Sequence, residues 1–262
     1  MKRVVFNQKG GVGKTSITCN LAAISAARGL RTLVVDLDVQ GNTTHYLVGE
    51  IDADAFPAEA QGAAGLFKQT VGSRKMHQNP DSFVWETPWE NLFLLPSSPV
   101  LTQLERELES RYKIYKLRDA LQKLDAEYDR VYIDTPPNFN FYSKSALIAA
   151  DTVLVPFDCD SFARQSLYSL MDNIAELQED HNPDLAVEGI VINQFNSQAR
   201  LPGELVAELE EEGYPVCATY LSASVKMRES HHEHRPLVDL APSHKLTQQF
   251  LALYDELESG RD

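Results

Sequence analysis

The sequence predicts a doubly wound α/β fold, with a mostly parallel, twisted sheet flanked by helices. Three observations lead to this fold class. Short apolar segments rich in β-branched residues alternate with helical segments along most of the chain. A glycine-rich loop separates the first apolar segment from the first helical one, and acidic residues end two later apolar segments. Such folds bind ligands at the carboxyl ends of their strands, so these loops are the candidate site.

The expected strands are short and apolar on both faces. They occupy Arg3–Gln8, Thr32–Asp36, Leu92–Pro96, Arg130–Asp134, Thr152–Pro156 and Val187–Asn193. A strand without polar alternation is typical of a parallel sheet whose two faces are both covered by helices. The length of 262 residues and the hydrophobic content of 43% suit one large domain spanning residues 1–262.

Helical periodicity fills the connections between these strands. The first helix is expected over Lys14–Arg28, because Ile17, Leu21 and Ile24 share one face and Gly29 can cap its end. Further helices are expected over Leu101–Leu124, Tyr142–Ala149, Ser161–Gln178 and Pro202–Glu212.

The segment Gly49–Glu90 has no clear period and is rich in glycine and proline. We expect it to be a surface excursion with one or two short helices. A partner-specific insertion is the alternative interpretation.

The glycine-rich loop has the chemistry of a phosphate-binding loop. Residues 9–15 read Lys9-Gly10-Gly11-Val12-Gly13-Lys14-Thr15. The usual pattern, G-x-x-x-x-G-K-[ST], would place a glycine where Gln8 stands, but its remaining parts are present. The glycines let backbone N–H groups turn toward an anion, and the helix that follows adds its N-terminal N–H groups, including that of Ser16. Lys14 would reach the β- and γ-phosphates, and the Thr15 hydroxyl would bind Mg²⁺.

Two acidic motifs complete the candidate site. Asp36 and Asp38 end the second expected strand, and Asp134 ends the fourth in Val131-Tyr132-Ile133-Asp134-Thr135-Pro136-Pro137. An aspartate at such a strand end can hold Mg²⁺ against the β- and γ-phosphates. Each aspartate alone could be a turn or a helix cap. In a chain with a phosphate loop, a joint role in nucleotide chemistry is the better interpretation.

Together the loop, the Asp36–Asn42 run and the motif beginning at Asp134 resemble the ParA/MinD family of deviant Walker A P-loop ATPases. Within that family, Asp-Leu-Asp-x-Gln-Gly-Asn resembles the ParA branch, which often has proline where Val39 stands. The order of elements follows the family from residue 2 to about residue 250.

The resemblance implies a homodimer that sandwiches two ATP molecules with Mg²⁺. Lys9 would cross to the partner's nucleotide, and Asp38 would orient the attacking water. Asp36 and Asp134 would support Mg²⁺, with Thr15 as its direct ligand, while Asn193 matches a position that contacts adenine. ATP hydrolysis would be slow alone and faster with an unidentified adaptor protein, in order to position a plasmid, a chromosome or a protein assembly.

ParA-like dimers also bind DNA without sequence preference through basic residues of the C-terminal third. The net charge of −14 opposes such binding, so a local basic patch would be needed. Any one of these residues could equally be an ordinary surface cation. The candidates are Arg200, Lys226, Arg228, Arg235 and Lys245.

The alternative is a MinD-like nucleotide-gated switch at a membrane. MinD-like members end in a basic amphipathic helix. Here a stripe of Leu246, Phe250, Leu253 and Leu257 carries acidic neighbours, so we expect this helix to pack on the domain. Two other classes fit less well. A metal-cluster carrier needs paired cysteines near the second acidic motif, and a self-phosphorylating tyrosine kinase needs a terminal tyrosine cluster beyond Tyr254.

The remaining features concern compartment and histidines. Cys19, Cys159 and Cys217 are widely spaced, so we expect reduced thiols in a cytoplasmic protein. The DNA binding that the resemblance implies would associate this protein with the nucleoid. No apolar stretch is long enough to cross a bilayer, and the chain enters its first strand too early for a signal peptide. The histidines at positions 231, 232 and 234 have poor metal-ligand spacing, but they could make DNA affinity depend on pH.

Overall fold

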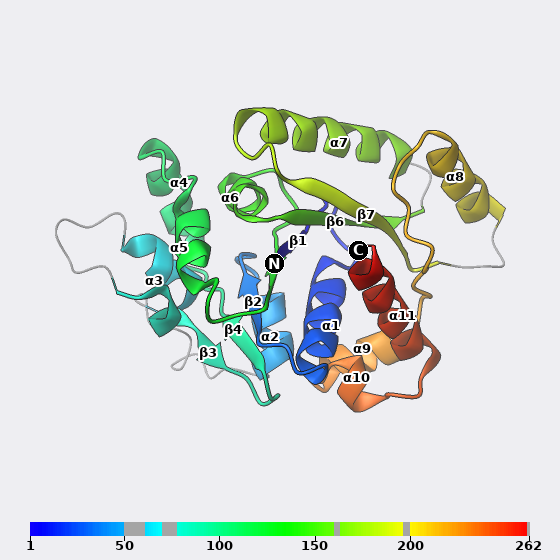
Figure 1. Ribbon diagram of the computed structural model, residues 1–262, viewed down its shortest axis with the longest axis horizontal. Coiled ribbons are helices and arrows are strands. Elements are labelled where there is room, and N and C mark those ends of the chain that lie inside the picture. The colour runs from blue at the N-terminus through cyan, green and yellow to red at the C-terminus, as the bar shows by residue number, and fades with distance from the viewer. Residues whose placement is uncertain (50–60, 70–77, 160–162, 196–199, 261–262) are drawn as a thin grey trace.

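A computed structural model shows a seven-stranded sheet with strand order β3-β4-β2-β5-β1-β6-β7 (Figure 1). It describes residues 1–49, 61–69, 78–159, 163–195 and 200–260. All strand pairs are parallel except β3 with β4, which is antiparallel at the sheet edge. The α/β fold with a mostly parallel sheet is therefore confirmed. β1 lies between β5 and β6, so the loop that follows it is central in the molecule.

The strands are β1 (Lys2–Val5), β2 (Thr32–Asp36), β3 (Trp85–Glu86), β4 (Leu92–Leu95), β5 (Arg130–Asp134), β6 (Thr152–Asp158) and β7 (Ala186–Asn193). Successive residues of a strand enter opposite cores, as their pleat requires. In β1, for example, Val4 and Val5 are both fully buried but pack in separate hydrophobic clusters. This double burial explains why the strands lack polar alternation.

The described helices include α1 (Lys14–Ala27), α2 (Asn42–Val48), α3 (Gly62–Lys68), α4 (Leu101–Ser110), α5 (Lys116–Leu124), α6 (Phe141–Ala149), α7 (Ala163–Asp180), α8 (Arg200–Glu211), α9 (Val225–His232), α10 (Leu237–Leu240) and α11 (Lys245–Ser259), with a 3₁₀ turn at Pro80–Phe83. α1, α2, α10 and α11 bury their apolar residues in one cluster, while α3 to α8 contribute to the other. Figure 1 shows α1 and α11 side by side on one face of the sheet, with α6 and α7 on the other.

The single helix expected over Leu101–Leu124 is wrong, because the chain breaks into α4 and α5. Tyr112 adopts a left-handed backbone conformation with φ of 55°. The N–H of Lys113 reaches back to the carbonyl of Leu108 at 3.0 Å, which is a helix-ending hydrogen bond. Glycine is the usual residue at such a position, so a tyrosine there does not signal the end of a helix.

The surface excursion expected over Gly49–Glu90 is also wrong in part. The short helix α3 agrees with the expectation of one or two short helices, but its residues Ala63, Ala64 and Phe67 are fully buried in the core. The described part also supplies the edge strand β3, which pairs with β4. The partner-specific insertion remains untested, and part of this segment lies outside the described residues.

The C-terminal helix α11 packs on the domain, as expected from its acidic face. Leu246, Phe250, Leu253 and Leu257 are buried beside α1. Its carboxylates contact the body of the protein, where Glu258 pairs with Arg130 at 2.8 Å. Across the described residues, no helix is both long and apolar enough to cross a membrane.

None of the three cysteines, all of which lie in the described part of the chain, forms a disulfide. Cys19 and Cys217 are buried, and burial raises the pKa of the Cys217 thiol to about 12 and that of Cys19 well above its usual range. Cys159 is only partly buried and follows directly after β6.

Candidate nucleotide-binding site

The glycine-rich loop connects β1 to α1 at the carboxyl edge of the sheet. Gly11 and Gly13 have φ of 77° and 93°, a left-handed region that residues with a Cβ rarely adopt. Gly13 is also the N-cap of α1, and no side chain caps this helix. The N–H groups of the first turn therefore have neither intrahelical acceptors nor a side-chain cap, which makes this terminus suited to an anion.

Asn193 at the end of β7 holds the loop from the other side. Its side-chain amide donates to the carbonyl of Val12 at 2.8 Å. A Cβ built on Gly13 would lie 2.2 Å from the Asn193 amide nitrogen, so a side chain at position 13 would collide with it. The expected contact of Asn193 with adenine is untested, but its position against the loop is defined by this hydrogen bond.

The two lysines of the loop meet each other. Lys14 Nζ donates to the backbone carbonyl of Lys9 at 2.9 Å, and the Lys9 N–H donates to the Asn7 side chain at 2.9 Å. Burial lowers the pKa of Lys14, while the nearby Asp134 and Asp38 carboxylates oppose this shift. The Lys14 ammonium is thus held inside the loop, facing the acidic residues.

Asp36 and Asp134 are register partners on β2 and β5, and both are fully buried. Asp134 accepts hydrogen bonds from the hydroxyls of Thr15 at 2.7 Å and Thr43 at 2.6 Å. Asp36 accepts from both the N–H and the hydroxyl of Thr44, at 2.8 and 2.7 Å. Burial raises the pKa of both carboxyls, and the Asp134 charge raises that of Asp36 further.

Asp38 lies just beyond the end of β2 and is 8% exposed. Its carboxylate accepts from the Gln40 N–H at 3.0 Å, and its carbonyl accepts from the Ser97 hydroxyl at 2.6 Å. The first contact orients the carboxylate, and the second fixes the Asp38 backbone to the loop after β4.

The donor set fits Mg²⁺ and a triphosphate. The Asp38 and Asp134 carboxylates both face the Lys14 ammonium, so the buried negative charge exceeds this one positive charge, and a divalent cation would compensate the difference. Thr15 already places its hydroxyl oxygen against Asp134, and oxygen ligands of this kind are those that Mg²⁺ prefers. The glycine cradle beside them fits the phosphates.

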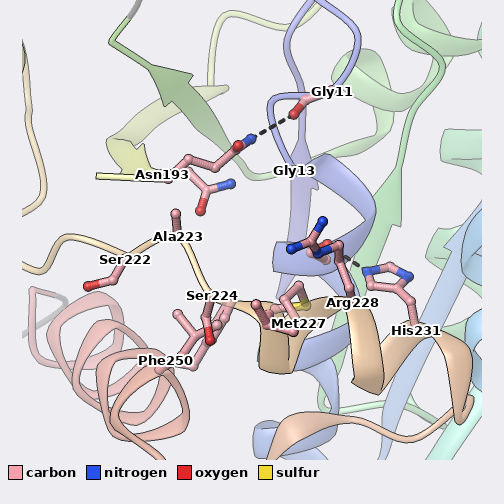
Figure 2. A pocket seen from close by; sticks show the side chains of 14 residues that line it. Gly11, Gly13, Asn193, Ser222, Ala223, Ser224, Met227, Arg228, His231 and Phe250 are labelled. Atoms are coloured by element: carbon pink, nitrogen blue, oxygen red, sulfur yellow. Dashed lines mark hydrogen bonds between the residues drawn. The ribbon is translucent and has the colours of Figure 1, made fainter. Parts of the chain in front are cut away.

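A cavity of about 590 Å³ opens beside the loop. Figure 2 shows Gly13 and Asn193 on one side of it and Met227, Arg228 and His231 of α9 on the other. Its size and its mixture of apolar and polar walls suit a nucleoside.

The structure places four of the five DNA candidates near the C-terminal helices. Lys226 and Arg228 lie on α9, Arg235 follows it, and Lys245 begins α11. Lys226 pairs with Glu229, and Arg235 pairs with Asp239 at 2.8 Å. Arg200 begins α8, but its side chain lies outside the described residues.

Sequence reasoning missed several residues that build the site. Thr43 and Thr44 bind the two buried aspartates, and Asn7 fixes the start of the loop. The two threonines follow the Asp36–Asn42 run directly, so their position was a usable signal. The sequence suggests a role for His231 only as part of the histidine group at positions 231, 232 and 234. In the structure its Nε2 lies 2.8 Å from the Ser16 hydroxyl in the first turn of α1.

Fold and site together define a P-loop ATPase. A family model described as an AAA domain matches residues 2–187. The chain is 34% identical to the chromosome partitioning protein ParA of Myxococcus xanthus, over 97% of this chain and 86% of that protein. It belongs to the ParA/MinD family of P-loop ATPases.

Solved structures share the fold. Apo McdA from Cyanothece has a TM-score of 0.84 at 21% identity, covering 98% of each chain. Cobyrinic acid a,c-diamide synthase from Mycobacterium smegmatis, with bound ADP and magnesium, has a TM-score of 0.75 at 29% identity. That match covers 88% of this chain and 91% of the other.

Proposed function

We propose that this protein is a ParA-like partitioning ATPase that closes as a dimer around two ATP molecules with Mg²⁺. In the ATP state it binds DNA without sequence preference, and an adaptor protein stimulates hydrolysis to position or segregate a cargo. The observation that carries this proposal is the joined arrangement of the Lys9–Thr15 loop, Asp38 and the buried pair of Asp36 and Asp134. The relatives named for chromosome partitioning support it.

Each loop residue has a distinct proposed role. The backbone N–H groups of residues 10–16 and the Lys14 ammonium bind the phosphates, and Asn193 supports the adenine side of the pocket. Thr15 binds Mg²⁺ with support from Asp36 and Asp134. Bound Mg²⁺ would supply charge neutralisation between the β- and γ-phosphates. Asp38 orients the water that attacks the γ-phosphate, and Lys9 reaches the nucleotide of the partner subunit.

Hydrolysis in such a site depends on positioning and electrostatics rather than on a covalent intermediate. A site that requires both a second subunit and an adaptor would turn over slowly alone. The dimer doubles each basic residue of the C-terminal helices, which would offset the net charge of −14 locally. Nucleoid association follows from this proposal.

The experiment is a DNA-binding titration with ATP, with ADP and without nucleotide, at two salt concentrations. We expect binding only with ATP, weakened steeply by salt. Asp38→Ala should bind ATP, remain dimeric by size-exclusion chromatography with light scattering, and stay on DNA. Lys226→Glu with Lys245→Glu, two candidates that do not line the nucleotide cavity, should lose DNA but keep ATP-dependent dimerisation. Binding of the parent that is undetectable, or equal in all nucleotide states, would refute nucleoid binding, and flotation with liposomes would then test the membrane alternative.

A further inference from the structure

His231 joins three elements at the edge of the nucleotide cavity. It lies on α9, its Nε2 lies 2.8 Å from the Ser16 hydroxyl of α1, and its ring stacks on Tyr46 of α2. The ring centroids are 4.3 Å apart, with an interplanar angle of 17°. Figure 2 shows His231 at the cavity, on the same side as Arg228 and Met227. None of the roles proposed above uses this residue.

The surroundings hold the imidazole in one orientation. Tyr46 is 1% exposed, and its hydroxyl bonds to Ser230 and receives a hydrogen bond from Asn20 at 3.2 Å. Asn20 also donates to the Ser16 carbonyl at 2.8 Å. Two neighbouring residues of α9, Ser230 and His231, are thus fixed against the same tyrosine, so the imidazole is preorganised toward Ser16.

Ser16 stands in the first turn of α1, where N–H groups point toward a bound anion. Its hydroxyl has a single proton to donate. Burial, and to a smaller extent the charge of His234, lowers the pKa of His231 and favours its neutral form. A neutral imidazole has one donor and one acceptor nitrogen. With the donor nitrogen facing Ser16, the serine oxygen is occupied and its proton is free to point at the ligand.

We propose that His231 is a positioning residue of the nucleotide pocket, which orients the Ser16 hydroxyl toward the phosphate chain of the bound nucleotide. This inference rests on the proposed ATP binding. His231 itself does not touch the nucleotide in this account, and it acts only through Ser16. The opposite arrangement, in which the imidazole accepts the serine proton and keeps it from the ligand, predicts an effect of opposite sign.

The test is a double-mutant cycle on the dissociation constant for MgATP, measured by isothermal titration calorimetry. The four proteins are the parent, Ser16→Ala, His231→Phe and the double variant. Phenylalanine keeps the stacking on Tyr46 but has no nitrogen to face Ser16. We expect each single variant to bind roughly 5–30-fold more weakly, the range of coupling between groups in contact. The double variant should bind no more weakly than Ser16→Ala alone.

Two further variants separate positioning from a structural role. His231→Gln restores a donor at this place and should regain part of the lost affinity. His232→Phe changes the exposed neighbour on α9 and should leave the affinity unchanged. Circular dichroism and thermal unfolding check that each variant folds.

Additive losses in the cycle, tighter binding by His231→Phe, or no recovery in His231→Gln would each overturn the proposal. A parent that does not bind MgATP would instead refute the proposed function, before the cycle is read.

Discussion

At the scale of single residues, Gly13 shows how one position can serve both the loop and its support. Its φ of 93° and the 2.2 Å approach of the Asn193 amide both exclude a side chain. We expect Gly13→Ala to lower the free energy of unfolding by about 1–3 kcal/mol, from backbone strain and displacement of Asn193. Gly10→Ala is the matched control, because a Cβ there meets nothing within 4 Å, and it should change stability by less than about 0.5 kcal/mol. Urea unfolding measures both, and equal losses would contradict this account.

Lys9 and Lys14 differ in what they should do for catalysis. Lys14 is buried in its own subunit's loop, whereas Lys9 is proposed to act across the dimer. We expect Lys9→Ala to bind MgATP within a few-fold of the parent but to lose stimulated ATPase activity by about 100-fold or more, since charge supplied in trans can contribute 10³–10⁵. Lys14→Ala should lose nucleotide binding itself. Steady-state assays with adaptor compare the ATPase rates of Lys9→Ala and the parent. Equal rates would contradict the proposed role of Lys9 in hydrolysis.

The partly buried position of His231 gives the protein a specific dependence of stability on pH. Its pKa in the folded state is lowered by burial and by His234, while an unfolded chain has the ordinary value near 6.5. The unfolded state therefore binds more protons as the pH falls, and stability drops from about pH 6.5 downward until the folded pKa is passed. We expect urea unfolding between pH 5 and 8 to show a steeper acid loss for the parent than for His231→Phe. The same pH dependence of the unfolding free energy in both proteins would contradict this prediction.

At the scale of elements, the break between α4 and α5 stores strain on the surface. Tyr112 is 89% exposed and holds φ of 55° without a burial gain. We expect Tyr112→Gly to raise the free energy of unfolding by about 0.5–1 kcal/mol, because glycine accepts this conformation. Tyr112→Ala removes the same ring but keeps the strain, so it should give no gain. A stabilising alanine variant would show that the ring, not the backbone, carries the penalty.

Local motifs made most of the strands and the phosphate loop predictable from the sequence. The motif residues are contiguous, and most strands have an apolar centre. The α4–α5 break was not predictable, because Tyr112 lacks the glycine that usually signals a left-handed end. Nor could the sequence reveal that α3 fills the core, since its burial depends on elements distant in the chain.

The candidate site, like the fold, was predictable from the sequence only in part. The aspartates and the loop lysines were readable as motifs, but Asp134 meets Thr15 and Thr43 only in the folded chain. Ser16 and His231 are separated by 215 positions and meet only because α9 folds back onto α1. No periodicity or spacing in the sequence encodes such a contact.

At the scale of the whole molecule, a buried ion network ties the two ends of the chain together. Arg3 of β1 is fully buried and pairs with Glu188 of β7 at 2.6 Å and with Glu258 of α11 at 3.4 Å. We expect Glu188→Gln to cost about 3–5 kcal/mol, because it leaves a buried guanidinium without its main counter-charge. Asp255→Asn breaks the exposed pair with Arg28 and should cost less than about 1 kcal/mol. Denaturant titration compares the two, and similar losses would show that burial does not matter here.

Cys159 is a site at which the native protein can be labelled chemically. A maleimide dye attacks thiolates, so it will ignore the two deeply buried thiols and attach beside β6, the neighbour of the strand that opens into the phosphate loop. One fluorophore per protomer can therefore be installed without engineering. Self-quenching between two such fluorophores would report in real time when the proposed dimer closes and when it opens.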